Sequence, residues 1–131
     1  MSDNFTALVQ EAQQGLSLIS PLQLRALQQE NPDTLVLDVR DECDLNITGI
    51  IQGTVNVSMG TLFYKADHAM PTEHRAECLA NKARPIVTTC SFGLVASIAA
   101  KLLANYGFTN VHILEGGNTA WREAGLPLQK V

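Results

Sequence analysis

Four short segments rich in apolar residues constrain the fold of this chain more than any other feature. They are TLVLDV (34–39), TVNVS (54–58), PIVTT (85–89) and VHIL (111–114). TLVLDV is a continuous apolar run that ends in an aspartate, as in a strand that is buried on both faces of a parallel sheet and whose polar end marks the sheet edge. The sequence therefore predicts strands at these four places.

The segment between the last two strands carries the clearest helical pattern. Apolar residues over 94–103 form two adjacent rows, and Ser97, Lys101 and Asn105 form a polar stripe at four-residue spacing. Gly107 stands where a helix C-cap is expected. This pattern predicts a helix that begins shortly after Cys90.

Helical patterns also precede the first strand and follow the second. Residues 4–14 have apolar side chains at helical spacing, and Ser20 followed by Pro21 is typical of a helix start. Short helices joined by a loop at Pro71 are expected over 59–83. Strands separated by helices favour βαβ units, and hence an α/β fold with a mostly parallel sheet.

Size and charge exclude several classes of protein. The 131 residues can bury one core, so we expect one domain over 1–131. A net charge of −4 with scattered Lys and Arg argues against a nucleic-acid partner. No apolar run approaches the roughly 20 residues of a membrane span. The segment MSDNFTALVQEAQQG lacks the basic and apolar parts of a signal peptide, which predicts a cytoplasmic location.

The chain has three cysteines, Cys43, Cys78 and Cys90. An odd number without CxxC spacing favours neither a disulfide framework nor a zinc site, so no metal and no cofactor is expected. We expect Cys43 and Cys78 to be unreactive thiols. The alternative is a resolving role, in which one of them forms a disulfide with an oxidised Cys90.

Cys90 lies at the joint between a predicted strand and a predicted helix. Ligands of an open parallel sheet bind beyond the carboxyl ends of its strands, which brings Cys90 to one edge with 38–40, 57–58 and Glu115. If the N–H groups of 91–95 face the sulfur, the helix start favours the thiolate by up to ~2 kcal/mol. An inert buried cysteine is the alternative that these residues leave open.

The segment PIVTTCSFGLVASIAAKLLANYGFTNVHILEGGNTAWREAGLPL resembles, in order, the carboxyl half of a rhodanese domain, the sulfurtransferase module. Upstream, LVLDVRDECDL resembles the strand of that family that ends in Asp-Val-Arg. ITGIIQGTVNVS is similar to its Gly-His-Ile-Pro-Gly-Ala-x-Asn-Ile-Pro signature. The resemblance covers roughly residues 19–129 and leaves 1–18 as an N-terminal helical extension.

The resemblance implies a three-layer α/β fold with a central parallel five-stranded sheet flanked by helices. It implies that Cys90 takes a sulfane sulfur from a donor, holds it as a persulfide and passes it to a thiophilic acceptor. The loop that would cradle the persulfide with backbone N–H groups and bind substrate consists of Ser91, Phe92, Gly93, Leu94, Val95 and Ala96.

Other matched positions are expected to be structural. Asp38 and Arg40 match the Asp-x-Arg of the family and lie near the site. We expect Arg40 to pair with Asp44 or with a backbone carbonyl, and Asp38 to cap the following turn. The glycines of the LEGGNTAW segment are expected to allow a tight turn from strand to helix, and Trp121 is expected in the core.

The sequence departs from the family pattern within the loop. Many thiosulfate-using members carry an arginine where this chain has Val95, and Ile50 and Gln52 stand where His and Pro are usual. One charge-assisted hydrogen bond to the thiosulfate dianion contributes roughly 1.5 to 3 kcal/mol, so its loss weakens the reaction roughly 10- to 150-fold. We therefore expect a less charged donor, an organic or protein persulfide, with a thiol acceptor.

Two other functions stay open. A rhodanese-like binding or regulatory module without turnover is compatible with the charge-free loop. A related phosphatase or arsenate reductase has a loop one residue longer that ends in arginine, and Ala96 at that position argues against it. The sequence also leaves open whether two copies pair as a homodimer.

Overall fold

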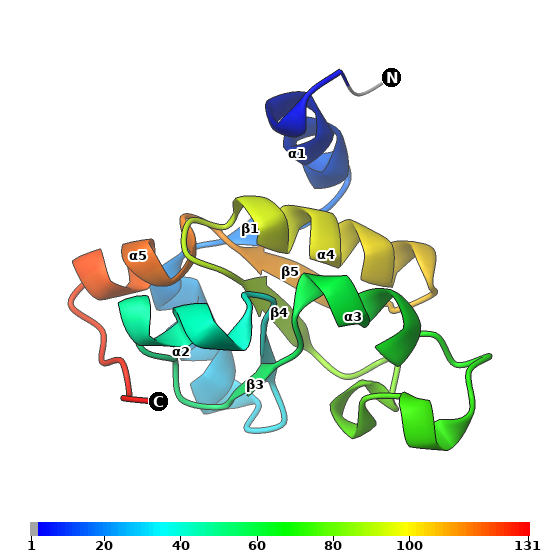
Figure 1. Ribbon diagram of the computed structural model, residues 1–131. Coiled ribbons are helices and arrows are strands. Elements are labelled where there is room, and N and C mark those ends of the chain that lie inside the picture. Colours follow the sequence, from blue (N-terminus) through cyan, green and yellow to red (C-terminus); the bar gives the residue numbers. More distant parts are fainter. Residues whose placement is uncertain (1–2) are drawn as a thin grey trace.

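The computed structural model describes residues 3–131 and arranges them as a parallel sheet between two layers of helices (Figure 1). The strand order is β1-β5-β4-β2-β3, and every pairing is parallel. The strands are β1 (Ser17–Ile19), β2 (Leu35–Asp38), β3 (Thr54–Asn56), β4 (Ile86–Thr89) and β5 (Val111–Leu114).

Helices connect these strands. The α-helices are α1 (Phe5–Gln13), α2 (Pro21–Glu30), α3 (Met59–Lys65), α4 (Leu94–Asn105) and α5 (Gly117–Glu123). Three 3-10 helices are η1 (Glu42–Ile47), η2 (Thr72–His74) and η3 (Glu77–Leu79). Of residues 3–131, no stretch of helix is both long enough and apolar enough to cross a membrane.

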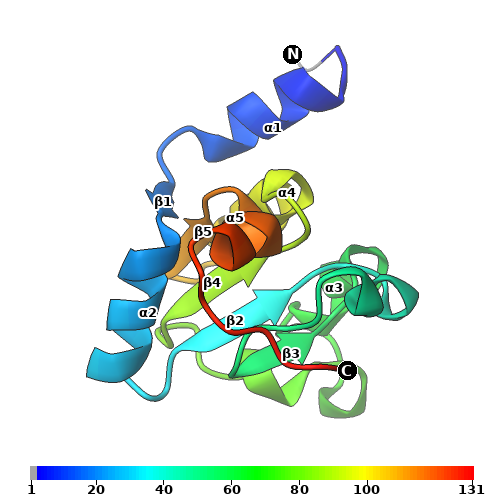
Figure 2. The same ribbon diagram turned by 90° about the vertical axis from the view of Figure 1, so that its left-hand side faces the viewer.

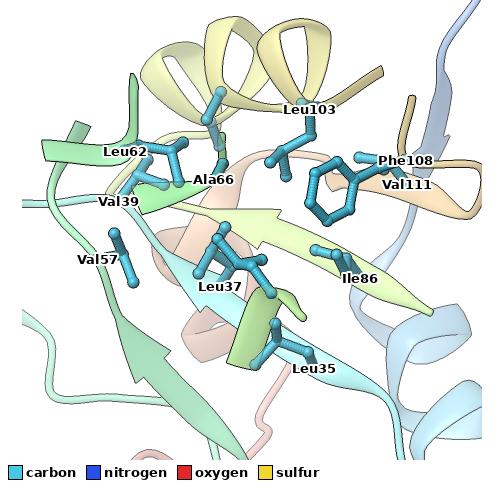
Figure 3. Close-up of a cluster of buried hydrophobic side chains, with 14 of the residues drawn as sticks. Leu35, Leu37, Val39, Val57, Leu62, Ala66, Ile86, Leu103, Phe108 and Val111 are labelled. Carbon is cyan, nitrogen blue, oxygen red and sulfur yellow. The ribbon is translucent and has the colours of Figure 1, made fainter. Parts of the chain in front are cut away.

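Apolar side chains from the central strands fill both faces of the sheet. Leu35 and Leu37 point into a cluster that α3 and α4 cover, which Figure 3 shows between strands and helices. Val36, between them, joins a second cluster on the opposite face, with Leu24 of α2 and Trp121 of α5. Because successive side chains of a strand alternate between faces, a strand covered on both sides must be apolar throughout.

The sequence predictions for the fold are confirmed in most respects. The three-layer α/β architecture and its five-stranded parallel sheet are as expected, and each of the four predicted strands is present. Ser20 caps α2 through a capping box with Gln23. Trp121 is buried, with 1% of its surface exposed.

The structure also differs from the predictions in two places. The strand β1 had no sequence signal of its own, because it has three residues, lies at the sheet edge and stays partly exposed. Ser97, predicted in a polar stripe of α4, has no exposed surface. Helix α1 packs against α4 (Figures 1 and 2), and its Gln13 is hydrogen-bonded to Ser97, so the stripe does not face solvent along its whole length.

We expect Leu37→Ala to lower the free energy of unfolding by about 2 to 5 kcal/mol, because it removes a fully buried side chain between the sheet and α4. The matched control is Leu22→Ala in α2, where 67% of the leucine surface is exposed and the change should stay within about 0.5 kcal/mol. Urea unfolding followed by Trp121 fluorescence measures both. Equal effects of the two substitutions would contradict the assignment of this core.

Candidate active site

The sulfur of Cys90 lies at the carboxyl end of β4, within a loop that leads into α4. Cys90 is buried, with 5% of its surface exposed. Its Sγ accepts hydrogen bonds from the backbone N–H of Gly93 at 3.1 Å and of Ala96 at 3.4 Å. Among the described residues, no side chain donates a hydrogen bond to this sulfur. The geometry suits an anionic sulfur, since both donors belong to the turn that opens a helix.

Close backbone packing gives the loop its shape. Gly93 adopts a φ of 84°, in the left-handed region that favours glycine. A Cβ at Gly117 would lie 2.5 Å from the Cys90 carbonyl oxygen and 2.6 Å from the Gly93 nitrogen. The start of α5 therefore presses directly against the loop and excludes any side chain at that position.

The first turn of α5 also holds the loop carbonyls. The N–H of Asn118 donates to the Cys90 carbonyl at 2.9 Å, and the N–H of Thr119 donates to the Ser91 carbonyl at 3.0 Å. These bonds direct the Cys90 and Ser91 carbonyls toward α5. The groups that contact the Cys90 sulfur are the N–H groups of Gly93 and Ala96.

Asp38 and Arg40 form a buried ion pair beside the site. The Arg40 Nη2 lies 2.7 Å from the Asp38 Oδ2, and the Asp38 Oδ1 accepts the Arg40 backbone N–H at 3.1 Å. The expected carbonyl contacts of Arg40 are present, at 3.0 Å to Gly49 and 3.4 Å to Asp44. The Asp44 carboxylate is not the ionic partner of Arg40, because Asp38 points toward the guanidinium and takes that place.

Asn118 links three segments around the loop and was not singled out by the sequence. Its Oδ1 accepts the Thr89 hydroxyl at 2.7 Å, and its Nδ2 donates to the Gly49 carbonyl at 3.3 Å. The residue is fully buried. The sequence feature that could have indicated Asn118 is its position in the LEGGNTAW segment, directly after two glycines.

A cavity of about 490 Å³ opens beside the cysteine. Of the predicted loop residues, Ser91, Phe92, Leu94 and Val95 line it. The buried residues Gly93 and Ala96 do not, and they contribute N–H groups to the sulfur instead. The remaining lining residues are Phe5, Val39, Arg40, Asp41, Asp44, Ile47, Met59 and Cys90. Neither Glu115 nor residues 57–58, expected at the same sheet edge, border this cavity.

Most of this cavity is apolar, and its charges are mainly negative. The acidic residues Asp41 and Asp44 are among those that line it. Arg40 supplies the one basic side chain among the described lining residues, and its guanidinium is already bonded to Asp38 and to backbone carbonyls. A dianionic ligand would therefore lie near two acidic residues, and none of the described lining residues offers it a free cation.

The other two cysteines have different surroundings. Cys43 is exposed in η1 and Cys78 is half-buried in η3, and all three cysteines are free thiols. Burial raises the pKa of the Cys78 thiol, although the nearby Arg84 guanidinium opposes this effect. A raised pKa lowers the fraction of reactive thiolate, which agrees with an unreactive Cys78.

Known sulfurtransferases resemble this chain in sequence. The family model for the rhodanese-like domain matches residues 20–124. The thiosulfate sulfurtransferase GlpE of Shewanella oneidensis is 32% identical over 89 residues, which cover 68% of this chain and 76% of that protein.

Solved structures agree with the sequence matches. The polysulfide-sulfur transferase homodimer of Wolinella succinogenes superposes with a TM-score of 0.73 and 30% identity, over 97% of this chain and 88% of that one. A protein from Rhodopseudomonas palustris, described as of unknown function and as a possible tyrosine phosphatase, superposes with a TM-score of 0.88 and 26% identity. This superposition covers 98% of this chain and 96% of the Rhodopseudomonas chain. With a family match over most of its length and a cysteine loop between β4 and α4, this chain belongs to the rhodanese-like domain family.

Proposed function

We propose that this chain is a sulfurtransferase in which Cys90 carries a sulfane sulfur as a persulfide. The observation that supports it most is the pair of N–H groups, from Gly93 and Ala96, that point at Sγ. Such donors stabilise negative charge on sulfur without a basic side chain. Membership in a family with sulfurtransferase relatives supports the same class of reaction.

The proposed reaction consists of two thiol exchanges. The Cys90 thiolate attacks the outer sulfur of a donor persulfide, the donor S–S bond breaks, and its electron pair leaves with the donor thiolate. The thiolate of an acceptor then attacks the outer sulfur on Cys90, and the Cys90 thiolate returns. Each step exchanges one thiolate for another, so no external oxidant or reductant and no cofactor takes part.

We further propose that organic or protein persulfides are better donors than thiosulfate. Val95 lines the cavity at the loop position where many thiosulfate-using members have arginine, and Asp41 and Asp44 add negative charge. The names of the relatives do not choose between donors, since one is named for thiosulfate and another for polysulfide. The electrostatics of the cavity support the less charged donor.

The proposal also includes a cytoplasmic location and a homodimeric assembly. A reducing cytoplasm suits the free thiols of Cys43, Cys78 and Cys90. Pairing of two copies is proposed because the Wolinella relative, matched over 97% of this chain, is described as a homodimer. Light scattering in solution distinguishes a dimer from a monomer.

Phosphatase activity is a weaker candidate, although one structural neighbour is described as a possible tyrosine phosphatase. Ala96 occupies the position at which such loops carry the arginine that holds the oxyanion, and it is fully buried. Without that guanidinium the loop lacks a clamp for a phosphoryl group. We therefore expect no hydrolysis of p-nitrophenyl phosphate.

Incubation with glutathione persulfide should add one sulfur, about 32 Da by intact-protein mass spectrometry, and cyanide or excess thiol should remove it. Cys90→Ser should abolish the adduct, whereas the matched Cys43→Ser and Cys78→Ser variants should keep it. Failure of the wild-type protein to form the adduct would favour a binding or regulatory module that does not turn over. An adduct that persists in Cys90→Ser would assign the chemistry to another cysteine.

The variant Val95→Arg should raise kcat/KM for thiosulfate by roughly 10- to 150-fold, because it restores one charge-assisted hydrogen bond to the dianion. Val95→Gln, a long but uncharged side chain, is the control and should give a much smaller gain. Steady-state rates with thiosulfate and with glutathione persulfide measure both. If the wild-type protein already uses thiosulfate as efficiently as the persulfide, the proposed donor preference is wrong.

A further inference from the structure

Helix α1 lies outside residues 20–124, which the family model matches, although the superposed Wolinella and Rhodopseudomonas structures cover nearly the whole chain. Figures 1 and 2 place it beyond α4, on the side away from the sheet. Val9 and Ala12 are buried, with 5% and 4% of their surfaces exposed. This helix is therefore a packed part of the fold, and it contacts α4 directly.

The first residue of α1 reaches the cavity of Cys90. Phe5 lines that cavity together with Phe92 and Leu94, which flank the turn at Gly93. The three side chains keep 48%, 63% and 44% of their surfaces exposed. Large apolar groups around a nucleophile, in a cavity of about 490 Å³, match the size and character of a small-molecule site.

The last residue of α1 is linked by hydrogen bonds to the cysteine loop. The Gln13 Nε2 donates to the Ser97 Oγ at 3.0 Å, and the Ser97 hydroxyl donates to the Gly93 carbonyl at 2.8 Å. A hydroxyl has only one proton, and with that proton on the Gly93 carbonyl the Ser97 oxygen accepts from Gln13. The Gly93 carbonyl also accepts the backbone N–H of Ser97 at 3.2 Å. Gly93 in turn directs its N–H at the Cys90 sulfur.

We infer that α1 belongs to the active site: Phe5 contacts the organic group of the sulfur donor, and Gln13 positions the cysteine loop through Ser97. This inference rests on the proposed sulfurtransferase function and adds its substrate class, persulfides with an apolar organic group. When the outer sulfur of such a donor reaches the Cys90 Sγ, its organic group would cover the exposed surfaces of Phe5, Phe92 and Leu94. This contact removes apolar surface from water and strengthens donor binding.

Two donors that differ only in the size of their apolar group test whether Phe5 contacts the donor. With benzyl hydropersulfide, Phe5→Ala should raise KM about tenfold, because the ring contact is lost, while kcat stays the same. With methyl hydropersulfide, KM should change by less than about twofold. Phe5→Leu, which keeps a large apolar side chain, should retain most of the affinity for the benzyl donor.

The control for this experiment is Leu8→Ala. Leu8 is on the same helix with 42% of its surface exposed, but it borders a neighbouring hollow rather than the Cys90 cavity. It should leave KM for both donors unchanged. Thermal unfolding of each variant identifies any loss of α1 packing. Equal responses of Phe5→Ala to both donors, or an equal response of Leu8→Ala, would overturn the inference.

The Gln13→Glu variant tests the positioning role. Glutamate offers an acceptor where Ser97 needs a donor, so it competes with Gly93 for the Ser97 proton. We expect kcat to fall roughly 3- to 30-fold with both donors, with KM unchanged, because the N–H of Gly93 is misplaced. Gln14→Glu adds the same charge one residue later and should have no such effect.

These experiments separate the inference from the proposed function. A wild-type protein that forms no adduct with methyl hydropersulfide contradicts the sulfurtransferase proposal. An adduct in the wild-type protein, with unaltered donor discrimination in Phe5→Ala and unaltered kcat in Gln13→Glu, contradicts the role of α1 alone.

Discussion

The two hydrogen bonds from backbone N–H groups to the Cys90 sulfur set the conditions for everything around them. Gly93 and Ala96 can aim their N–H groups at one atom only because the loop passes through a left-handed turn at Gly93. That turn requires close contact with Gly117, and the first turn of α5 holds the opposing carbonyls. The positions of β4, α4 and α5 are therefore tied to the geometry of one sulfur.

Because backbone N–H groups contact the sulfur, the charged side chains near the site can have other roles. Arg40 is buried, and its guanidinium is bonded to the Asp38 carboxylate and to the Gly49 carbonyl, which holds the segment that follows β2. The other charged residues that line the cavity are Asp41 and Asp44. In the proposed reaction, charge stabilisation at the sulfur comes from backbone dipoles, and discrimination among donors depends on the wall of the cavity.

Sequence patterns predicted most of the sheet, because a strand covered on both faces must be apolar. The edge strand β1 gave no such pattern, since it is short and partly exposed. The position of Cys90 between a strand and a helix could be predicted because a strand end and a helix start are local features. The place of Phe5 in the cavity could not, because it depends on how α1 packs against α4. The Asp38–Arg40 ion pair could not be predicted either, because residue spacing does not determine where a side chain points.

The most direct test of the central claim is the response of the Gly93 and Ala96 amide protons when Cys90 is converted to the persulfide. Amide resonances of the ¹⁵N-labelled protein can be recorded before and after loading, with mass spectrometry to confirm that the sulfur is on Cys90. We expect the two amide protons to shift markedly, while amides of α2, on the opposite face of the sheet, stay in place. A fully loaded Cys90 that leaves both resonances unchanged would show that these N–H groups do not hold the transferred sulfur.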